Sequence, residues 1–171
     1  MSKLRIELLA RRHAVEPFDC GRPPLNLYLQ RHAFTNQAAG AGRTYVAVSG
    51  EEVVGYYTLA AGQVEYEAAP ERVSKGLARQ PIPVLLLARL AVGLGWQGRG
   101  VGGGLIKDVM VRAAAAADIA GIRALYVEAK DDAARHFYER LDFFASEEEP
   151  DHLYLLMKQV RASVAKRAPA P

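Results

Sequence analysis

Hydrophobic and polar positions repeat along the chain with two different periods, and each period predicts a type of element. Short apolar or alternating runs bounded by turn residues predict strands, and these runs are residues 4–10, 43–48, 53–64, 82–92, 122–130, 143–146 and 152–160. Apolar residues three and four apart predict helices over residues 25–32, 105–117 and 134–141. Residues 65–80 mix charges with Pro, Gly and Ala, which predicts a loop with one short helix. Because strands and helices interleave, the pattern predicts an α/β (α+β) fold with helices packed on a sheet.

Length and charge suggest the domain organisation. The chain has 171 residues, which suits one domain, and we expect that domain to span residues 1–160. The positive net charge of +3 is concentrated at the end of the chain, in Lys158, Arg161, Lys166 and Arg167. Residues 161–171 are therefore predicted to form a basic, flexible tail. No apolar run reaches membrane-spanning length and the lone Cys20 cannot form an internal disulfide, so we expect a cytoplasmic protein.

Seven glycines crowd residues 89–110, RLAVGLGWQGRGVGGGLIKDVM, between a predicted strand and a predicted helix. Three phosphate-binding motifs compete for them. The Walker A pattern fails, because Gly104 stands where its lysine is required. The dinucleotide fingerprint G-x-G-x-x-G matches at Gly98, Gly100 and Gly103, but five residues separate it from the strand and too few elements follow it for that fold. The third pattern, Q/R-x-x-G-x-G/A, is met by Gln97, Gly100 and Gly102.

The surroundings of the third pattern favour it over the other two. A buried strand precedes it and a helix starts inside it, so successive backbone N–H groups at a helix N-terminus can bind an anion. Glycines let the backbone curl around a pyrophosphate without Cβ clashes. A flexible turn without a ligand is the competing interpretation. The sequence therefore favours a pyrophosphate-binding loop over residues 97–102.

The segments LARLAVGLGWQGRGVGGGLI and LYVEAKDDAARHFYERLDF resemble the acetyl-CoA-binding core of the GNAT superfamily of N-acetyltransferases. The resemblance implies the GNAT fold, a central mixed twisted sheet of about six to seven strands flanked by about four helices, and acetyl-CoA as co-substrate. It implies that the pyrophosphate is held by Gln97, Gly98, Arg99, Gly100, Val101 and Gly102. It implies that the pantetheine arm lies along the backbone of Leu90, Ala91 and Val92. Two positions depart from the family: Asp131 stands where an Asn often touches pantetheine, and Asp142 replaces a helix-ending glycine.

Acetyl transfer to an amine needs a neutral amine, a polarised thioester carbonyl and a proton for the leaving thiolate. The resemblance places Tyr138 close to the CoA sulfur, and an unperturbed tyrosine keeps its proton at neutral pH, so Tyr138 is the predicted acid. Tyr138 also lies on an apolar stripe, which leaves a core role open. The sequence places no general base; Glu128 and His136 are the nearest candidates. The histidines show no metal-ligand spacing, so no metal is predicted.

A narrower resemblance joins both halves of the chain, from FDCGRPPLNLYLQRHA to HLYLLMKQV. These segments look like the GNAT toxins of bacterial toxin–antitoxin pairs, which acetylate the α-amino group of the amino acid on charged tRNA and thereby block translation. The resemblance implies a ribbon-helix-helix antitoxin as partner and leaves the oligomeric state open, with a homodimer among the options. Candidate tRNA contacts are Arg31, Arg43, Lys75, Arg79 and Arg89, with Trp96 as a surface on which a base could stack.

Two other functions stay open at this point. A housekeeping GNAT enzyme would acetylate a small amine such as a polyamine, an antibiotic or a protein N-terminus, and the acidic residues of 147–151 could line a cleft for a polyamine. A non-catalytic acyl-CoA-binding module is the more remote alternative, because an intact Tyr138 stands beside a complete glycine loop.

Overall fold

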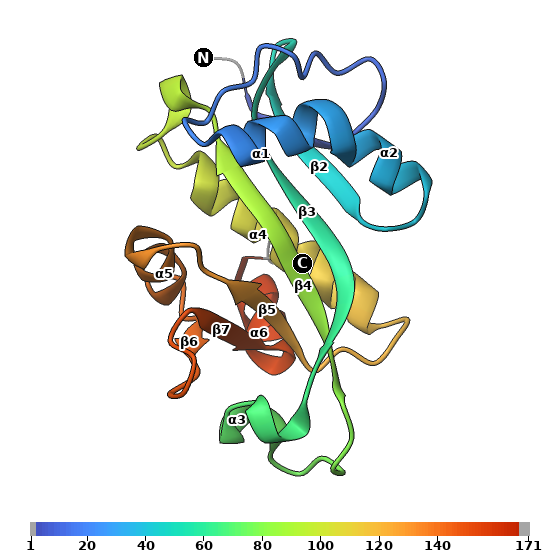
Figure 1. Ribbon diagram of the computed structural model, residues 1–171, viewed down its shortest axis with the longest axis vertical. Coiled ribbons are helices and arrows are strands. Elements are labelled where there is room, and N and C mark those ends of the chain that lie inside the picture. The colour runs from blue at the N-terminus through green and yellow to red at the C-terminus, as the bar shows by residue number, and fades with distance from the viewer. Residues whose placement is uncertain (1–2, 168–171) are drawn as a thin grey trace. The chain divides into compact units, whose positions relative to one another are not determined.

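The computed structural model describes residues 3–167 (Figure 1). These residues hold seven strands, in both parallel and antiparallel pairs, together with helices, which confirms the predicted mixed sheet. The chain divides into two compact units: the first comprises residues up to 60 and 87–109, and the second residues 61–86 and from 110 onward. Two strands and one helix pass from one unit into the other, namely β3 (Glu52–Val64), β4 (Ile82–Val92) and α4 (Val101–Ala117).

In the first unit, three strands form an antiparallel ladder in the order β1-β2-β3, where β1 is Arg5–Leu8 and β2 is Arg43–Ser49. The ladder of β2 and β3 changes register between Ala47 and Val48. The helices of the first unit are α1 (Pro23–Leu27), a π-helical turn (Tyr28–His32), α2 (Ala33–Ala38) and a 3₁₀ turn (Leu94–Trp96). The two prolines that open α1 suit the first turn of a helix, where a missing N–H costs nothing.

A buried hydroxyl connects the first helix to the sheet inside this unit. Tyr56 of β3 is fully buried and donates a hydrogen bond of 2.7 Å to the carbonyl oxygen of Leu25. Phe18 packs edge-on against the Tyr56 ring, with 5.6 Å between the ring centroids. The core of the first unit therefore positions the loop that precedes α1 as well as α1 itself.

In the second unit, β5 (Ala124–Glu128) pairs in parallel with β4 over Val84–Leu86 and antiparallel with β7 (His152–Leu156). The short strand β6 (Phe144–Ala145) adds to the far side of β7. The helices of this unit are α3 (Glu71–Ser74), α5 (Asp132–Glu139) and α6 (Met157–Arg167), besides a 3₁₀ turn (Tyr66–Ala68). Its core is built on Val73, Ile82, Val84, Ala124, Tyr126, Tyr154 and Leu156.

The end of the chain differs from the sequence prediction. The strand expected over residues 152–160 ends at Leu156, and residues 161–167, assigned above to a flexible tail, continue α6 up to Arg167. The helix is fixed at its start, where the Gln159 side chain accepts a hydrogen bond from the Leu156 amide, and by the buried Val160. The Arg161 guanidinium lies 2.9 Å from the Asp118 carboxylate. Residues 168–171 of the predicted tail lie outside the described part of the chain.

No helix within residues 3–167 combines the length and the apolar character that crossing a bilayer requires.

Candidate active site

The glycine loop of the first unit joins β4 to α4, and its backbone has a conformation that glycine adopts most readily. Gly98 and Gly100 have positive φ angles of 74° and 84°, a region where a side chain causes strain. A Cβ atom placed on either residue would meet no heavy atom within 4 Å. The conformation of the chain therefore favours glycine at these two positions, and the space around each Cβ position is open.

Helix α4 begins at Val101, directly after the loop. The amides of its first turn have no acceptor within the helix, and the positive end of the helix dipole lies there. Its first turn carries no acidic residue. The loop and the helix start together offer backbone donors and a favourable dipole to an anion such as a pyrophosphate. The residues present therefore fit the phosphate part of acetyl-CoA.

Two exposed side chains of the loop form hydrogen bonds to backbone carbonyl oxygens and hold the loop in place. The Gln97 side-chain amide donates hydrogen bonds to the carbonyl oxygens of Cys20, at 3.0 Å, and Val92, at 2.9 Å. The Arg99 guanidinium donates to the Gly95 carbonyl at 3.2 Å and lies 4.1 Å from the centre of the Trp96 ring. The glutamine of the motif thus has a structural role, because it connects the loop to the end of β4 and to the segment before α1.

The last residues of β4 lie against β3. Ala91 is buried, while Leu90 and Val92 are half-buried. At Gly55 of β3, a Cβ atom would come within 3.0 Å of the Ala91 carbonyl oxygen, so the close approach of the two backbones requires glycine there. The predicted pantetheine strand is therefore held rigidly in the same unit as the glycine loop.

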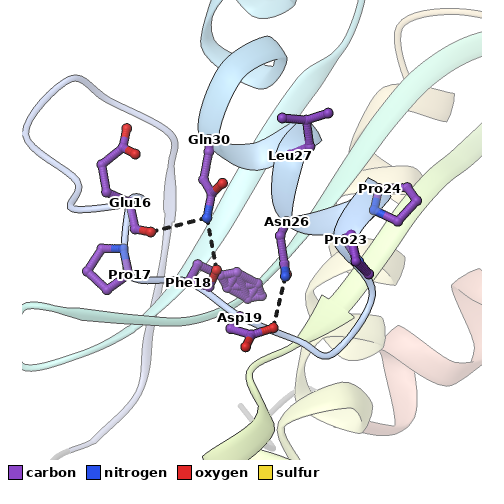
Figure 2. A pocket seen from close by; sticks show the side chains of 9 residues that line it. All are labelled: Glu16, Pro17, Phe18, Asp19, Pro23, Pro24, Asn26, Leu27 and Gln30. Atoms are coloured by element: carbon purple, nitrogen blue, oxygen red, sulfur yellow. Dashed lines mark hydrogen bonds between the residues drawn. The ribbon is translucent and has the colours of Figure 1, made fainter.

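A groove of about 670 Å³ lies beside α1 and is lined by residues between positions 16 and 30. The same segment contains Cys20, whose carbonyl oxygen accepts a hydrogen bond from Gln97 of the glycine loop. Figure 2 shows how polar side chains hold its walls: the Asn26 amide donates to the Asp19 carboxylate at 2.9 Å, and the Gln30 amide donates to the carbonyl oxygens of Glu16 and Phe18. The Asp19 backbone carbonyl in turn accepts a hydrogen bond from the Leu94 amide at 2.9 Å. The segment before α1 therefore supports the loop. The sequence alone did not predict this support, because the contacts join residues far apart in the chain.

Tyr138 belongs to the second unit and lies on α5. Its side chain is buried, and its ring packs against Phe137 and Phe143, with centroid distances of 5.2 and 5.4 Å. Burial raises the pKa of the Tyr138 hydroxyl above its ordinary value, so the group keeps its proton at neutral pH. No side chain within residues 3–167 hydrogen-bonds this hydroxyl. Its oxygen is not fully enclosed by protein atoms, so it does not need a partner from the protein. The hydroxyl is therefore a protonated donor available to a ligand.

The turn after α5 contains Asp142 at the place where the family has a helix-ending glycine. This residue has a φ of 72°, the left-handed conformation that a glycine would adopt with less strain. The Phe143 amide donates to the Tyr138 carbonyl at 3.2 Å and the Asp142 amide to the Glu139 carbonyl at 3.0 Å. These two bonds form a Schellman motif, and the contact between the rings of Phe143 and Tyr138 is its usual hydrophobic companion. The departure from the family pattern therefore leaves the turn intact.

The remaining candidate residues of the second unit have more ordinary surroundings. Asp131 is the N-cap of α5, where its carboxylate accepts a hydrogen bond of 2.8 Å from the Ala134 amide. Its proposed contact with pantetheine stays a prediction. The Glu128 carboxylate is exposed and lies 3.8 Å from the ring of His152, and His136 is exposed on α5. No metal-binding group of three His, Cys, Asp or Glu residues occurs among residues 3–167.

The basic residues proposed for tRNA are distributed over both units. In the first unit Arg31 and Arg43 are exposed, and the Arg89 guanidinium lies 3.6 Å from the centre of the Tyr28 ring. In the second unit the Arg79 guanidinium lies 5.6 Å from the centre of the Tyr66 ring, and Lys75 lines a small basic pocket. Arg72 and Arg123 line the same pocket, and no motif in the sequence marks them.

Comparison with known proteins assigns the class. Residues 40–144 match the family model described as the acetyltransferase (GNAT) domain. The match covers the whole glycine loop, the predicted pantetheine strand and Tyr138. The chain therefore belongs to the GNAT acetyltransferases, as its sequence motifs implied.

Individual relatives narrow the comparison. A Mycobacterium tuberculosis protein named tRNA-acetylating toxin is 44% identical over 150 residues, which make up 88% of this chain and 90% of the relative. The solved structure of AtaT complexed with acetyl-methionyl-tRNAfMet has a TM-score of 0.87 and 30% identity, and the match covers 94% of this chain and 99% of AtaT. A tyrosine-to-phenylalanine mutant of the AtaT toxin, bound to the C-terminus of the antitoxin AtaR and acetyl-CoA, has a TM-score of 0.81 and 30% identity, with 95% and 99% covered.

Proposed function

We propose that this protein transfers the acetyl group of acetyl-CoA to the α-amino group of the amino acid on charged tRNA, and that it thereby blocks translation as the toxin of a toxin–antitoxin pair. The observation that carries the proposal is the 44% identity, over 88% of the chain, to a protein named for the acetylation of tRNA. The left-handed glycine loop and the buried, protonated Tyr138 supply the parts that the reaction needs.

The residues of the chain divide the work between binding and proton transfer. The loop from Gln97 to Gly102 and the first turn of α4 hold the pyrophosphate through backbone amides. The backbone of Leu90, Ala91 and Val92 orients the pantetheine arm and polarises the thioester carbonyl. Tyr138 donates its proton to the thiolate as the bond from carbon to sulfur breaks and the bond from carbon to the amine nitrogen forms. The proton that the amine loses leaves to solvent and water restores the proton of Tyr138.

The proposed substrate also explains why the sequence places no general base. An α-amino group next to an ester has a lowered pKa, because the ester withdraws electrons from it. A large fraction of it is neutral near pH 7, so it can attack the thioester without a side chain to deprotonate it. A polyamine is protonated at that pH and would need a base.

The proposal includes a partner. A neighbouring toxin structure contains the C-terminus of its antitoxin, and we propose that a small ribbon-helix-helix antitoxin neutralises this protein in the cytoplasm. Expression of the chain alone in bacteria should arrest growth, and co-expression with the protein encoded next to it should restore growth. If no neighbouring gene product suppresses the arrest, the antitoxin part of the proposal fails. The homodimer stays a prediction, which sedimentation of the purified protein would test.

Mass spectrometry of aminoacyl-tRNA tests the reaction itself. A mixture of charged tRNAs incubated with the enzyme and acetyl-CoA should acquire acetyl groups on the amino acid, while uncharged tRNA should stay unmodified. The same incubation with spermidine is the matched control for a small-amine enzyme. Acetylated spermidine together with unmodified aminoacyl-tRNA would overturn the proposal and return the protein to the housekeeping branch.

A further inference from the structure

The second unit contains a basic pocket that takes no part in the proposed binding of acetyl-CoA or in proton transfer; of its residues, only Lys75 was named above as a candidate tRNA contact. The pocket has a volume of about 260 Å³, and three separate segments of the chain line it: α3 with the residue after it, the two residues before β5, and the junction of β7 with α6. Four of its seven lining residues are cations and none is an acid: Arg72, Lys75, Arg123 and Lys158. Its other residues are apolar: Ile122, Leu156 and Met157.

The charge of this pocket is not neutralised by the protein. Among residues 3–167, no carboxylate forms an ion pair with any of the four cations. Bringing like charges together without a counter-charge is unfavourable, and a bound anion would relieve it. A cluster of this kind is the electrostatic footprint of a polyanion site.

Two of the four cations are held in place by groups that carry no negative charge. The Arg123 guanidinium donates hydrogen bonds to the carbonyl oxygens of Val73, at 2.8 Å, and Lys75, at 3.1 Å. The Arg72 guanidinium lies 3.9 Å from the centre of the Phe144 ring. These contacts fix both guanidinium groups while leaving their positive charge available, so the pocket is organised before any ligand binds.

We infer that this pocket binds a phosphate group of the RNA backbone, an inference that rests on the proposed tRNA substrate. Four cations without an acid match the charge of a polyanion, and the proposed tRNA substrate is a polyanion. The Nε and Nη2 atoms of Arg123 already donate to carbonyl oxygens, so this edge cannot make the two parallel bonds by which arginine grips a carboxylate or a phosphate. The pocket therefore attracts an anion mainly through its charge. The exposed Lys75 and Lys158 act as mobile point charges, which suit a phosphate whose oxygens face several directions.

The test compares two double variants of the full chain in their binding of uncharged tRNA. Lys75→Gln with Lys158→Gln removes two exposed cations from the pocket. Lys3→Gln with Lys107→Gln removes two exposed lysines that do not line it and serves as the control. All four changes keep a long polar side chain, so melting temperatures should stay close to that of the original protein. Arg123 is left unchanged, because its hydrogen bonds to the backbone are structural.

Binding should be measured by fluorescence anisotropy over a range of salt concentrations. Loss of one phosphate contact should lower the slope of log affinity against log salt by about 0.7 to 0.9, which is about 5- to 8-fold in affinity near 0.1 M salt. The loss should be similar for different tRNA sequences, because phosphate contacts carry no sequence information. The control variant should keep the original slope.

An unchanged slope in the pocket variant would overturn the inference. So would a loss of affinity for the antitoxin with unchanged tRNA binding, which would make the pocket part of a protein interface. The measurement uses uncharged tRNA and no acetyl-CoA, so it is independent of the reaction. If the enzyme acetylates charged tRNA but the pocket variant keeps the original salt slope, only this inference fails. If the pocket variant has a reduced slope but the enzyme does not acetylate charged tRNA, only the proposed function fails.

Discussion

In the glycine loop of the first unit the backbone makes the proposed contacts with acetyl-CoA, whereas on α5 of the second unit a single side-chain hydroxyl is the proposed proton donor. The loop depends on two left-handed glycines, and its side chains Gln97 and Arg99 bond to carbonyl oxygens of their own unit. Tyr138 sits among aromatic rings, and its environment determines its pKa. Changes of backbone conformation in the first region should therefore lower the affinity for acetyl-CoA, and loss of one oxygen atom in the second should lower kcat.

The largest expected effect comes from the second region. Tyr138→Phe removes the hydroxyl and keeps the ring packed against Phe137 and Phe143, so stability should change little. Loss of a positioned acid should lower kcat by about 10² to 10⁴-fold with little change in the affinity for acetyl-CoA. Single-turnover kinetics with charged tRNA, together with calorimetry for acetyl-CoA, measure the two quantities separately.

Tyr154→Phe is the matched control for this prediction. Tyr154 is also a buried tyrosine of the second unit, and burial raises its pKa to about 12. Its loss of a hydroxyl should leave kcat unchanged. Equal turnover in the original protein and in Tyr138→Phe would return Tyr138 to a purely structural role and remove the contrast between the two regions.

A smaller effect is expected from a change of conformation in the glycine loop. Gly100→Ala puts a side chain on a residue with a φ of 84°, although there is free space around the new Cβ atom. An alanine in the left-handed region costs roughly 1–2 kcal/mol, so the affinity for acetyl-CoA should fall about 5- to 30-fold when the loop must keep that conformation to bind. Calorimetry of acetyl-CoA binding measures the change.

Gly104→Ala tests whether acetyl-CoA binding depends on the backbone conformation of Gly100 or only on the added methyl group. Gly104 lies in the first turns of α4, and a Cβ atom there would also meet nothing within 4 Å. Alanine in a helix should raise the free energy of unfolding by about 0.5–1 kcal/mol and leave acetyl-CoA binding unchanged. If the two alanines weaken binding equally, the positive φ of Gly100 is not what the ligand requires.

The two regions also differ in how much of them the sequence predicts. The glycine loop is a contiguous motif between a strand and a helix, so its place in the fold and its backbone character follow from residues 97–104 alone. Asp142 likewise stands where the family has a helix-ending glycine, which marks the position of the turn in the sequence. Both features are local, and local propensity is strong where only glycine or Asp/Asn suits the backbone.

The features that the sequence did not predict depend on contacts between distant residues. The strand expected up to residue 160 stops at Leu156, because a buried Val160 and the Gln159 side chain at the helix start favour α6 over an extended chain. The basic pocket joins Lys75, Arg123 and Lys158, which are separated by more than thirty positions from one to the next. Its hydrogen bonds to carbonyl oxygens of α3 and the residue after it leave no periodic signal in the sequence.

The smallest expected effect concerns the turn that ends α5 and positions the chain after Tyr138. Asp142→Gly relieves the cost of a left-handed residue but adds freedom to the unfolded chain, so the free energy of unfolding should rise by about 0.5–1 kcal/mol. For a chain of this size that is a rise of about 1–4 °C in Tm. Thermal unfolding followed by circular dichroism measures the shift.

Asp132→Gly is the control at the other end of the same helix, where Asp132 pairs with Arg135 at 3.4 Å and favours the positive end of the helix dipole. That change should lower stability by about 1 kcal/mol, so the two variants should shift Tm in opposite directions. The kcat of Asp142→Gly should stay unchanged, because the Schellman bonds from Phe143 and residue 142 do not involve the side chain. A fall in kcat without a fall in stability would instead assign the Asp142 carboxylate a part in the reaction. Tyr138 of α5 would then not be the only side chain involved, because the turn after the helix would contribute a second one.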